Sequence, residues 1–494
     1  MSHIHFLSRT NIVSFIIPSR WNNHSIMTEQ SFHHDGMICT NRCIGLLILV
    51  LTALPLYVRA QTSERIDTLA PMTVWECIDY AVAHSHGLRQ RTLQLDNSEA
   101  TRMQAAGAFL PSLGASAGTQ WNFGRAIDPE TNTYTSVSTF NNGYGLSTSL
   151  PVFDGLSRLH TLRAARADVL MQKNALQADR DQVALDTYQA FTNVVYYQET
   201  VRLAEEKLHE SKLLLRQTEV MEEEGLKSAA DVALIRAQVE ADKLTLTRQE
   251  NQRESGMLKL KEVMNWEVND ELRMTNDELR MTNDESMNTL TKENQPNSSL
   301  AIRHSALLLQ SYYHMESTRH ALGAARSNFY PTVYLNAGVN TSYFRNLSAT
   351  HTTAYGQQLK NNLGEYVSLS LSIPLFNRLG NIAALRRAKN NARIAEEQYA
   401  AKQMELEVLR QQAHLDVKAY QQECVQGTAK VAADSLAYEL TRQQYTQGLA
   451  SPIDLQTQAT TLLQSRASLL QSRLMVGVKE MMVRYYEGEP LDPR

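Results

Sequence analysis

The stretch that decides the fold is Ser-Leu-Pro-Val-Phe-Asp-Gly-Leu at residues 149–156, which recurs as Ser-Ile-Pro-Leu-Phe-Asn-Arg-Leu at residues 372–379. Every residue number in the second stretch is 223 higher than that of its counterpart. The same offset relates the pattern Gly-Leu-x-Ser-x-x-Asp at residues 225–231 to its repetition at residues 448–454. Because the offset stays constant from one pattern to the other, the chain is predicted to contain two tandem copies of one unit.

Upstream of these stretches the offset between the two copies is 220. It relates Pro111 of the first copy to Pro331 of the second. The segment from Pro331 to Pro374 is therefore three residues longer than the segment from Pro111 to Pro151.

Each copy is predicted to form a helix, two strands and a long helical hairpin. The first helix is expected to begin at the capping box Thr73-Val74-Trp75-Glu76, in which the first and last side chains accept hydrogen bonds from each other's backbone amides. The expected segments are a leader at 1–60, a helix at 61–110, a β-hairpin at 111–151, a helical hairpin at 152–267, a linker at 268–300, a helix at 301–330, a β-hairpin at 331–374, a helical hairpin at 375–486 and a tail at 487–494.

Apolar and polar residues alternate in both predicted β-hairpins. Val367, Leu369 and Leu371 alternate with serines, and the segments 113–123, 144–150 and 333–339 follow the same period of two. The polar positions are mostly Ser, Gly and Asn, which is typical of transmembrane barrels with a wet lumen. An ordinary one-sided sheet would show the same alternation.

Four strands per chain are too few to close a barrel. An open sheet edge in lipid leaves its backbone groups without hydrogen bonds, which is not viable. If the strands cross a membrane, the barrel must therefore be shared between chains. No apolar run in the sequence reaches the ~20 residues of a spanning helix.

The predicted helical hairpins are unusually long. Residues 156–224 contain neither Gly nor Pro, which permits a helix on the order of 100 Å at ~1.5 Å per residue. A coiled-coil seam is expected on the returning helix, with alternating steps of four and three, and a local bend is expected at Gly427. The expected seam residues are Ala230, Leu234, Ala237, Ala241 and Leu244.

A secretory signal peptide is predicted at the N-terminus. Residues 44–58 are apolar, follow Arg42 and precede the cleavage pattern Val58-Arg59-Ala60, so the mature chain is expected to start at Gln61. We expect translation to begin at Met37, with a longer leader from residue 1 as the alternative. The two cysteines of the mature chain, Cys77 and Cys424, are expected to be buried thiols, with a disulfide between them as the alternative.

A perfect seven-residue duplication lies between the two copies. The sequence Asn-Asp-Glu-Leu-Arg-Met-Thr at residues 269–275 is repeated at residues 276–282. Its polar character predicts a solvated linker, and a binding role is the minority interpretation.

Composition argues against an enzyme and against a nucleic-acid partner. The net charge is -4, and the sequence contains no GxSxG, HExxH, GxGxxG or P-loop motif. We expect no catalytic residue, no metal and no cofactor.

These features resemble the TolC family of outer-membrane efflux channels. The resemblance rests on the duplication, the Ser-x-Pro-x-Phe that ends each β-hairpin, the repeated turn pattern and the ending Tyr-Tyr-Glu-Gly at residues 485–488. Residues 122–129 are similar to the branch of the family found in Bacteroidetes. The resemblance implies a mainly α chain with transmembrane β-strands, in which three copies share a 12-stranded barrel and long coiled-coil hairpins extend into the periplasm.

The resemblance also implies partners and sites. A periplasmic adaptor and an inner-membrane pump would bind the channel, in drug efflux or in type I secretion, and outer-membrane lipid would surround the barrel. The expected adaptor contacts at the hairpin tips are Gly225, Leu226, Ser228, Asp231, Gly448, Leu449 and Ser451.

Two residues near the second turn match the family's periplasmic gate. They are Tyr445 and Asp454, while the Arg and the second Asp of that gate are replaced by Ala450 and Thr457. A ring of Asp454 would attract cations, and helix capping is its alternative role. For the whole chain, the alternative function is a periplasmic coiled-coil scaffold or adhesin without a pore.

Overall fold

The computed structural model describes residues 71–127, 133–136, 138–275, 305–347, 353–489 and 491, all of which belong to one compact unit. The predicted signal peptide, the predicted start at Met37 and the second copy of the duplicated heptad lie outside the described residues.

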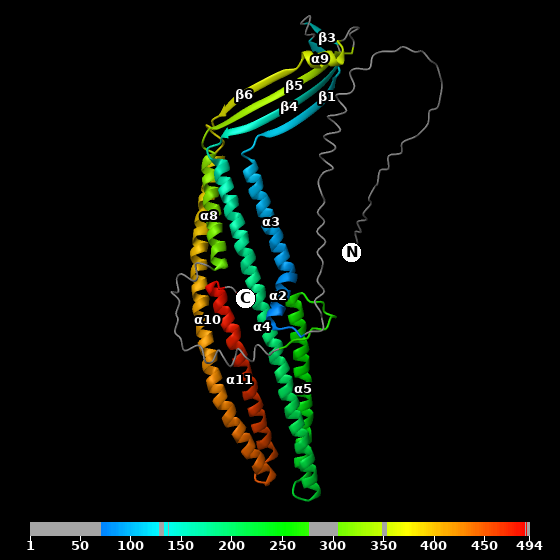
Figure 1. Ribbon diagram of the computed structural model, residues 1–494, viewed down its shortest axis with the longest axis vertical. Coiled ribbons are helices and arrows are strands. Elements are labelled where there is room, and N and C mark those ends of the chain that lie inside the picture. The colour runs from blue at the N-terminus through cyan, green and yellow to red at the C-terminus, as the bar shows by residue number, and fades with distance from the viewer. Residues whose placement is uncertain are drawn as a thin grey trace, which may run out of the picture. The chain divides into compact units, whose positions relative to one another are not determined.

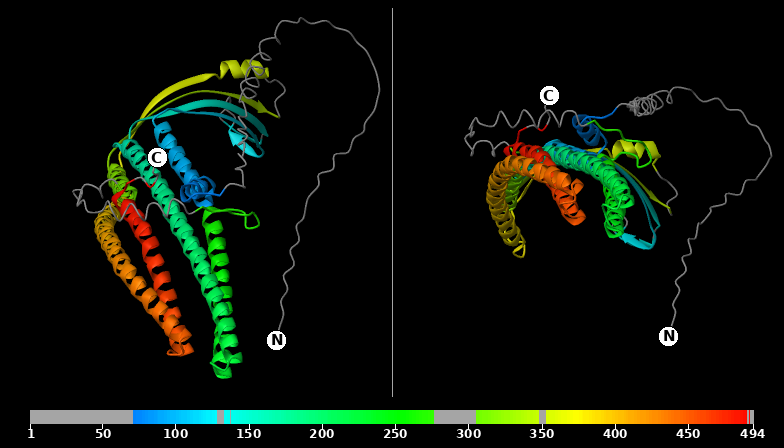
Figure 2. Two further views of the ribbon diagram at one scale, coloured as in Figure 1. Left: turned by 60° about the horizontal axis from the view of Figure 1, so that its bottom comes forward. Right: turned by 90° about the horizontal axis from the view of Figure 1, so that it is seen from below.

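Two very long helices run through the unit. They are α4 (Ser157–Glu223) and α10 (Gly380–Thr446), each of 67 residues, or about 100 Å at ~1.5 Å per residue. Each turns at its lower end into a return helix of 36 residues, α5 (Ala229–Met264) or α11 (Pro452–Glu487). The upper half is completed by α3 (His86–Gly107) and α8 (Ala306–Ser327), so that the helices form one curved layer (Figures 1 and 2).

The first predicted helix is divided in two. The capping box forms as expected at the start of α2 (Val74–His84), where the Thr73 amide donates to Glu76 Oε2 over 2.7 Å. The helix then breaks at Ser85, which ends α2 and caps α3 by accepting a hydrogen bond from the Leu88 amide. A serine can compete for backbone amides in this way, which is why it interrupts the expected continuous helix.

A four-stranded antiparallel sheet stands at the other end of the helices. Its strands are β1 (Ser112–Asn122), β4 (Thr139–Phe153), β5 (Thr332–Asn346) and β6 (Gly364–Ser372), in the order β1-β4-β5-β6. The four predicted strands are therefore confirmed. A short hairpin of β2 (Arg125–Ile127) and β3 (Tyr134–Ser136) and the helix α9 (Tyr355–Asn361) were not expected.

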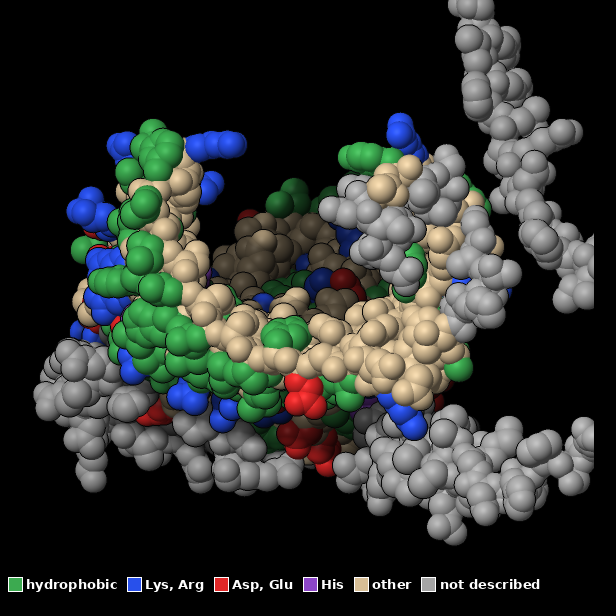
Figure 3. All heavy atoms as spheres, turned by 90° about the horizontal axis from the view of Figure 1, so that it is seen from above, with side chains coloured by type: hydrophobic (Ala, Val, Ile, Leu, Met, Phe, Trp, Pro, Cys, Tyr) green, Lys and Arg blue, Asp and Glu red, His purple; other side chains and the backbone are tan. Residues whose placement is uncertain are grey.

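The sheet has one apolar and one polar face. Its register places Ala115 opposite Leu146, and Leu146 in turn opposite Val339, so the apolar positions of neighbouring strands share one side. Figure 3 shows hydrophobic side chains along the outer side of the sheet, while backbone and side chains that are neither hydrophobic nor charged predominate on its hollowed inner side. The alternation in the sequence is thus carried through the whole sheet.

The end of β4 differs from the expected hairpin boundary. The strand passes through Pro151 and reaches Phe153, with a register irregularity between these residues. Proline is tolerated here because β1 pairs with β4 only as far as Ser149, so the Pro151 position faces a strand on one side alone.

Glycines explain two local features of the helices. Gly155 has a φ of +65°, and a Cβ there would lie 2.7 Å from the Tyr330 Cβ at the junction of β4 and α4. The bend expected at Gly427 does not interrupt α10; a Cβ at Gly427 would lie 3.2 Å from Leu469 Cδ1. Gly427 therefore lets α11 approach α10 closely.

The predicted coiled-coil seam of α5 has the correct spacing but lies on the wrong face of the helix. The predicted seam residues Leu234 and Leu244 are exposed, as are the three alanines. The buried side of this part of α5 is formed by Val232, Ile235, Val239 and Asp242. A buried aspartate belongs to this side, and this charged residue hid the true seam in the sequence.

The start of the expected linker is not solvated. Leu272, in the first copy of the duplicated heptad, is buried in the main hydrophobic core together with Trp266. The backbone of this copy also pairs with Met72, whose amide donates to the Arg273 carbonyl over 2.9 Å. The heptad can dock because its Leu and Met supply apolar contacts within a polar sequence.

Both described cysteines are free and buried, so the alternative of a disulfide between them is rejected. Burial raises the pKa of the Cys77 thiol to about 12.

Candidate functional site at the hairpin tips

The two hairpin tips have the same backbone geometry. Gly225 and Gly448 each have a φ of +76°, a left-handed conformation that glycine adopts without steric cost. The next amide in each tip reaches back to the helix: Leu226 donates to the Met221 carbonyl, and Leu449 to the Gln444 carbonyl, both over 2.8 Å. With the bonds made by the glycine amides, this is a Schellman ending, which satisfies the last carbonyls of α4 and α10.

The helix that follows each tip begins with a capping box. Ser228 accepts a hydrogen bond from the Asp231 amide, and the Asp231 carboxylate accepts one from the Ser228 amide over 3.2 Å. Ser451 and Asp454 repeat this arrangement in the second tip, with the Ser451 amide again 3.2 Å from the carboxylate. The Gly, Ser and Asp of the repeated pattern therefore end one helix and start the next.

The leucines of the pattern have no such role in the chain. Leu226 is 69% exposed and Leu449 is 76% exposed, although both are large and apolar. Because a helix ending does not require these side chains to face solvent, the tips present two apolar groups on a rigid support.

Tyr445 lies between the two hairpins and not on an exposed surface. Its ring is 1% exposed, and its hydroxyl shares a hydrogen bond of 2.9 Å with the Thr218 hydroxyl of α4. The ammonium group of Lys227, from the first tip, lies 4.3 Å from the ring centroid. Burial raises the pKa of Tyr445, so the hydroxyl remains a neutral hydrogen-bond donor or acceptor. Tyr445 of the second helical hairpin is thus held by Thr218 and Lys227 of the first.

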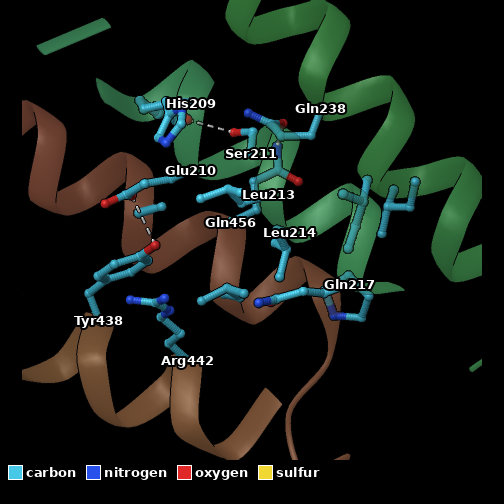
Figure 4. A pocket seen from close by; sticks show the side chains of 16 residues that line it. His209, Glu210, Ser211, Leu213, Leu214, Gln217, Gln238, Tyr438, Arg442 and Gln456 are labelled. Atoms are coloured by element: carbon cyan, nitrogen blue, oxygen red, sulfur yellow. Dashed lines mark hydrogen bonds between the residues drawn. The ribbon is translucent and has the colours of Figure 1, made fainter. Parts of the chain in front are cut away.

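A groove separates the two hairpins above the tips. It encloses a cavity of about 310 Å³, and the Tyr438 hydroxyl crosses it to donate to Glu210 Oε2 over 3.1 Å (Figure 4). Burial, reinforced by the Glu210 carboxylate, raises the pKa of Tyr438 to about 12. Lys207 of α4 also reaches Thr460 of α11 over 3.2 Å. Polar links therefore join the hairpins at several levels.

Asp454 is exposed, and its carboxylate is bound by the cap. The Ser451 hydroxyl and amide hold the pKa of Asp454 below its usual value, so the group stays ionised. Capping alone accounts for its position in the chain. Within one chain, Tyr445 is therefore a buried link between the hairpins and Asp454 an exposed cap of α11.

The sequence did not reveal the partners of Tyr445. Thr218 and Lys227 belong to the other repeat, and no short motif marks a contact between residues so far apart in the chain. The offset of 223 pairs Thr218 with Thr441 but pairs Tyr445 with Glu222, so the repeat offers Thr441 no tyrosine as a corresponding partner.

A long helical hairpin joined to an amphipathic sheet, present twice, defines a class of membrane channel subunits. The model of the family described as "Outer membrane efflux protein" matches residues 77–265 and 297–478, so the chain belongs to this family. The chain is a subunit of an outer-membrane efflux channel that extends into the periplasm. It is a channel and not an enzyme, and the alternative of a scaffold without a pore is rejected.

Several solved structures of membrane proteins share the fold. CusC has a TM-score of 0.75 at 16% identity, over 84% of this chain and 92% of its own. VceC from Vibrio cholerae has a TM-score of 0.73 at 15% identity, over 85% and 97%. CmeC from Campylobacter jejuni has a TM-score of 0.71 at 16% identity, over 86% and 90%. No protein of curated function matches the chain significantly. Among the described residues, none of the helices is both long and apolar enough to span a bilayer.

Proposed function

We propose that three copies of this chain form a closed 12-stranded barrel in the outer membrane. This proposal rests on the sheet, in which β1 and β6 have a free edge among the described residues and the apolar face is suited to contact with lipid. An edge strand in lipid needs a partner, and further copies of the chain supply one. Three copies of four strands give 12, the number that the family resemblance implies.

The helices support the same assembly. The long helix α10 exposes large apolar side chains at intervals of about 11 residues, which is three helical turns and so one face of the helix. These residues are Ile382, Ile394, Met404, Leu415, Val425 and Leu436, and Val408 and Leu440 each follow one of them by four residues on the same face. A face of this kind is covered when neighbouring chains complete a tube.

We propose that the tips bind a periplasmic adaptor, which connects the channel to an inner-membrane pump. Leu226 and Leu449 would make the apolar contacts, while Gly225, Ser228, Asp231, Gly448 and Ser451 hold the two turns in shape. The channel conducts passively, and the pump supplies the energy and selects the substrate. The partner pump is proposed to be of the drug-efflux type, with type I secretion as the alternative. The similarity of residues 122–129 supports assignment to the Bacteroidetes branch.

We also propose that Tyr445 and Asp454 act at the periplasmic entrance. The Thr218–Tyr445 hydrogen bond would keep the hairpins together in the closed channel, and its loss would accompany opening. Three copies of Asp454 would add a ring of negative charge that favours cations.

The adaptor contact is tested by replacing both tip leucines. L226D/L449D should abolish co-purification of the adaptor and restore drug sensitivity, while the trimer remains intact on native gels. L93D, at an exposed leucine of α3, is the control. This variant should retain both co-purification of the adaptor and drug resistance. Gly225→Val and Gly448→Val should also impair adaptor binding, because a β-branched residue is strained at a φ of +76°. Normal adaptor binding by L226D/L449D would refute the tip assignment.

A further inference from the structure

The tandem repeat determines the register inside the sheet. In the first hairpin, Ser112 of β1 lies opposite Ser149 of β4. Adding 220 to the first residue number and 223 to the second yields Thr332 and Ser372, which lie opposite each other in β5 and β6. The two offsets, read from the sequence, therefore transfer strand pairing from one repeat to the other without error.

The same offsets can be applied to the contact between the two β-hairpins of one chain. This contact joins β4 to β5 and places Leu146 opposite Val339. The counterpart of β4 is β6, and the counterpart of β5 is β1. In a closed ring of alternating repeats, β6 of one chain therefore meets β1 of the next chain as β4 meets β5.

We infer that β6 pairs antiparallel with β1 of a neighbouring copy in the register that places Leu369 opposite Thr119 and Ser372 opposite Ser116. This inference rests on the proposed shared barrel and specifies the interface that closes it. The pair Ser149 and Asn336 is the counterpart of the Ser372–Ser116 pair within one chain, and there Ser149 donates to Asn336 Oδ1 over 2.8 Å.

The register keeps the two faces of the barrel separate. It places Val367 opposite Trp121 and Leu371 opposite Ala117, all on the apolar side, while the serines of β6 meet polar residues and glycines of β1. A shift by one residue would bring apolar side chains to the lumen.

Side-chain sizes also fit across the interface. A large residue of β6 meets a small one of β1 in the pairs Leu369–Thr119 and Leu371–Ala117. In the third pair the smaller residue, Val367, lies on β6 and the larger one, Trp121, on β1. Directly opposite side chains are in contact in an antiparallel sheet, so such pairs stabilise the interface. In the single chain these positions are uncovered; Val367, for example, is 77% exposed.

The length of β6 gives a further argument. The strand ends at Ser372, whereas its counterpart β4 continues to Phe153, because β5 pairs with the last residues of β4. In the described part of the chain no strand pairs with the corresponding end of β6, and Leu375 and Phe376 there are 93% and 78% exposed. Pairing with residues 113–115 of the neighbour would extend β6 to Phe376, the counterpart of the last residue of β4.

Cysteine cross-linking in outer membranes tests this register. S372C/S116C should form disulfides between chains on mild oxidation and give a covalent trimer on a non-reducing gel. The shifted pairs S372C/G114C and S372C/G118C should yield at least about five-fold less, because diagonal positions are ~7–8 Å apart and exceed the reach of a disulfide. Both glycines have open space for a side chain. S149C/N336C, the counterpart within one chain, shows whether a pair of this type can be oxidised.

The outcomes separate the register from the assembly. A maximum at a shifted pair, or no link at S372C/S116C while S149C/N336C is oxidised, would overturn the register. The size of the uncross-linked protein in detergent is measured in parallel. A trimer with the wrong cross-link refutes only the register, whereas a monomer refutes the shared barrel as well.

Discussion

Ser211 of α4 donates a hydrogen bond to the buried carboxylate of Asp242 on α5, and the second repeat holds the same two groups in exchanged positions. There the aspartate is Asp434 on the outgoing helix and the serine is Ser465 on the return helix, again hydrogen-bonded to each other. These residues are related to the first pair by the offset of 223. A lysine accompanies each pair, with Lys207 Nζ 3.2 Å from Asp242.

Exchanging the two residues of the first repeat should be tolerated, although each single change is not. D242S leaves Lys207 without its carboxylate, and S211D places two carboxylates together, so each should destabilise the hairpin by about 3 kcal/mol. The double variant S211D/D242S restores one carboxylate and one hydroxyl, as in the second repeat, and should recover most of the loss. The stabilities of the three variants are measured by thermal unfolding, which is monitored by circular dichroism. A double variant no more stable than the single ones would contradict the interpretation.

Removing the link between Thr218 and Tyr445 should loosen the periplasmic entrance. Y445F and T218V each lose the one hydrogen bond that the pair shares, so both should raise the single-channel conductance or the open time in planar bilayers. Combining them should add little, because the bond is already lost in each. T441V changes the threonine that corresponds to Thr218 in the other repeat and should behave as the wild type. An equal effect of T441V would show that the hairpin has only been weakened in general.

Neutralising Asp454 should reduce cation selectivity, whereas neutralising Asp231 should not. Both residues form the same capping box, so D454N and D231N disturb the helix start equally. The proposed charge ring at the entrance involves Asp454 alone. Reversal potentials in a salt gradient compare the two variants, and identical values would remove the lumen role. Because capping lowers the pKa of Asp454, the wild-type selectivity should persist in mildly acidic buffer.

Acidification from about pH 7 to about pH 5 should stabilise the α4 region. Burial raises the pKa of Asp181 to about 6, so the folded state binds this proton more tightly than the unfolded state. Its stabilising contribution is present at low pH and is lost as the pH rises through about 6. D181N should therefore raise the melting temperature at pH 7 and flatten its pH dependence.

Asp186 provides the control for this prediction. It is exposed and accepts a hydrogen bond from the glutamine four residues earlier, as Asp181 does. D186N makes the same Asp-to-Asn change at this exposed position and measures the effect of the substitution itself on the melting temperature. A profile that D181N leaves unaltered would contradict the assignment.

Features that depend on local sequence were predictable. The repeated Gly-Leu-x-Ser-x-x-Asp pattern specifies a helix end, a turn and a helix start within seven residues, and both tips form as these residues require. The strand alternation likewise determines which side of each strand is apolar.

Features that depend on distant contacts were not predictable. Asp242 is buried because Ser211 and Lys207 compensate its charge, and a search for apolar spacing passes over it. Tyr445 was identified from the family pattern, but its partners Thr218 and Lys227 lie on the other hairpin. Leu272 docks into the core although its neighbours in the heptad are polar.

Single-particle electron microscopy of the protein extracted from outer membranes tests the shared barrel most directly. We expect three chains around one 12-stranded barrel, with β6 of each chain joined to β1 of the next and three pairs of helical hairpins forming a tube below. A monomer with an open four-stranded sheet, or a different number of chains around the pore, would contradict it.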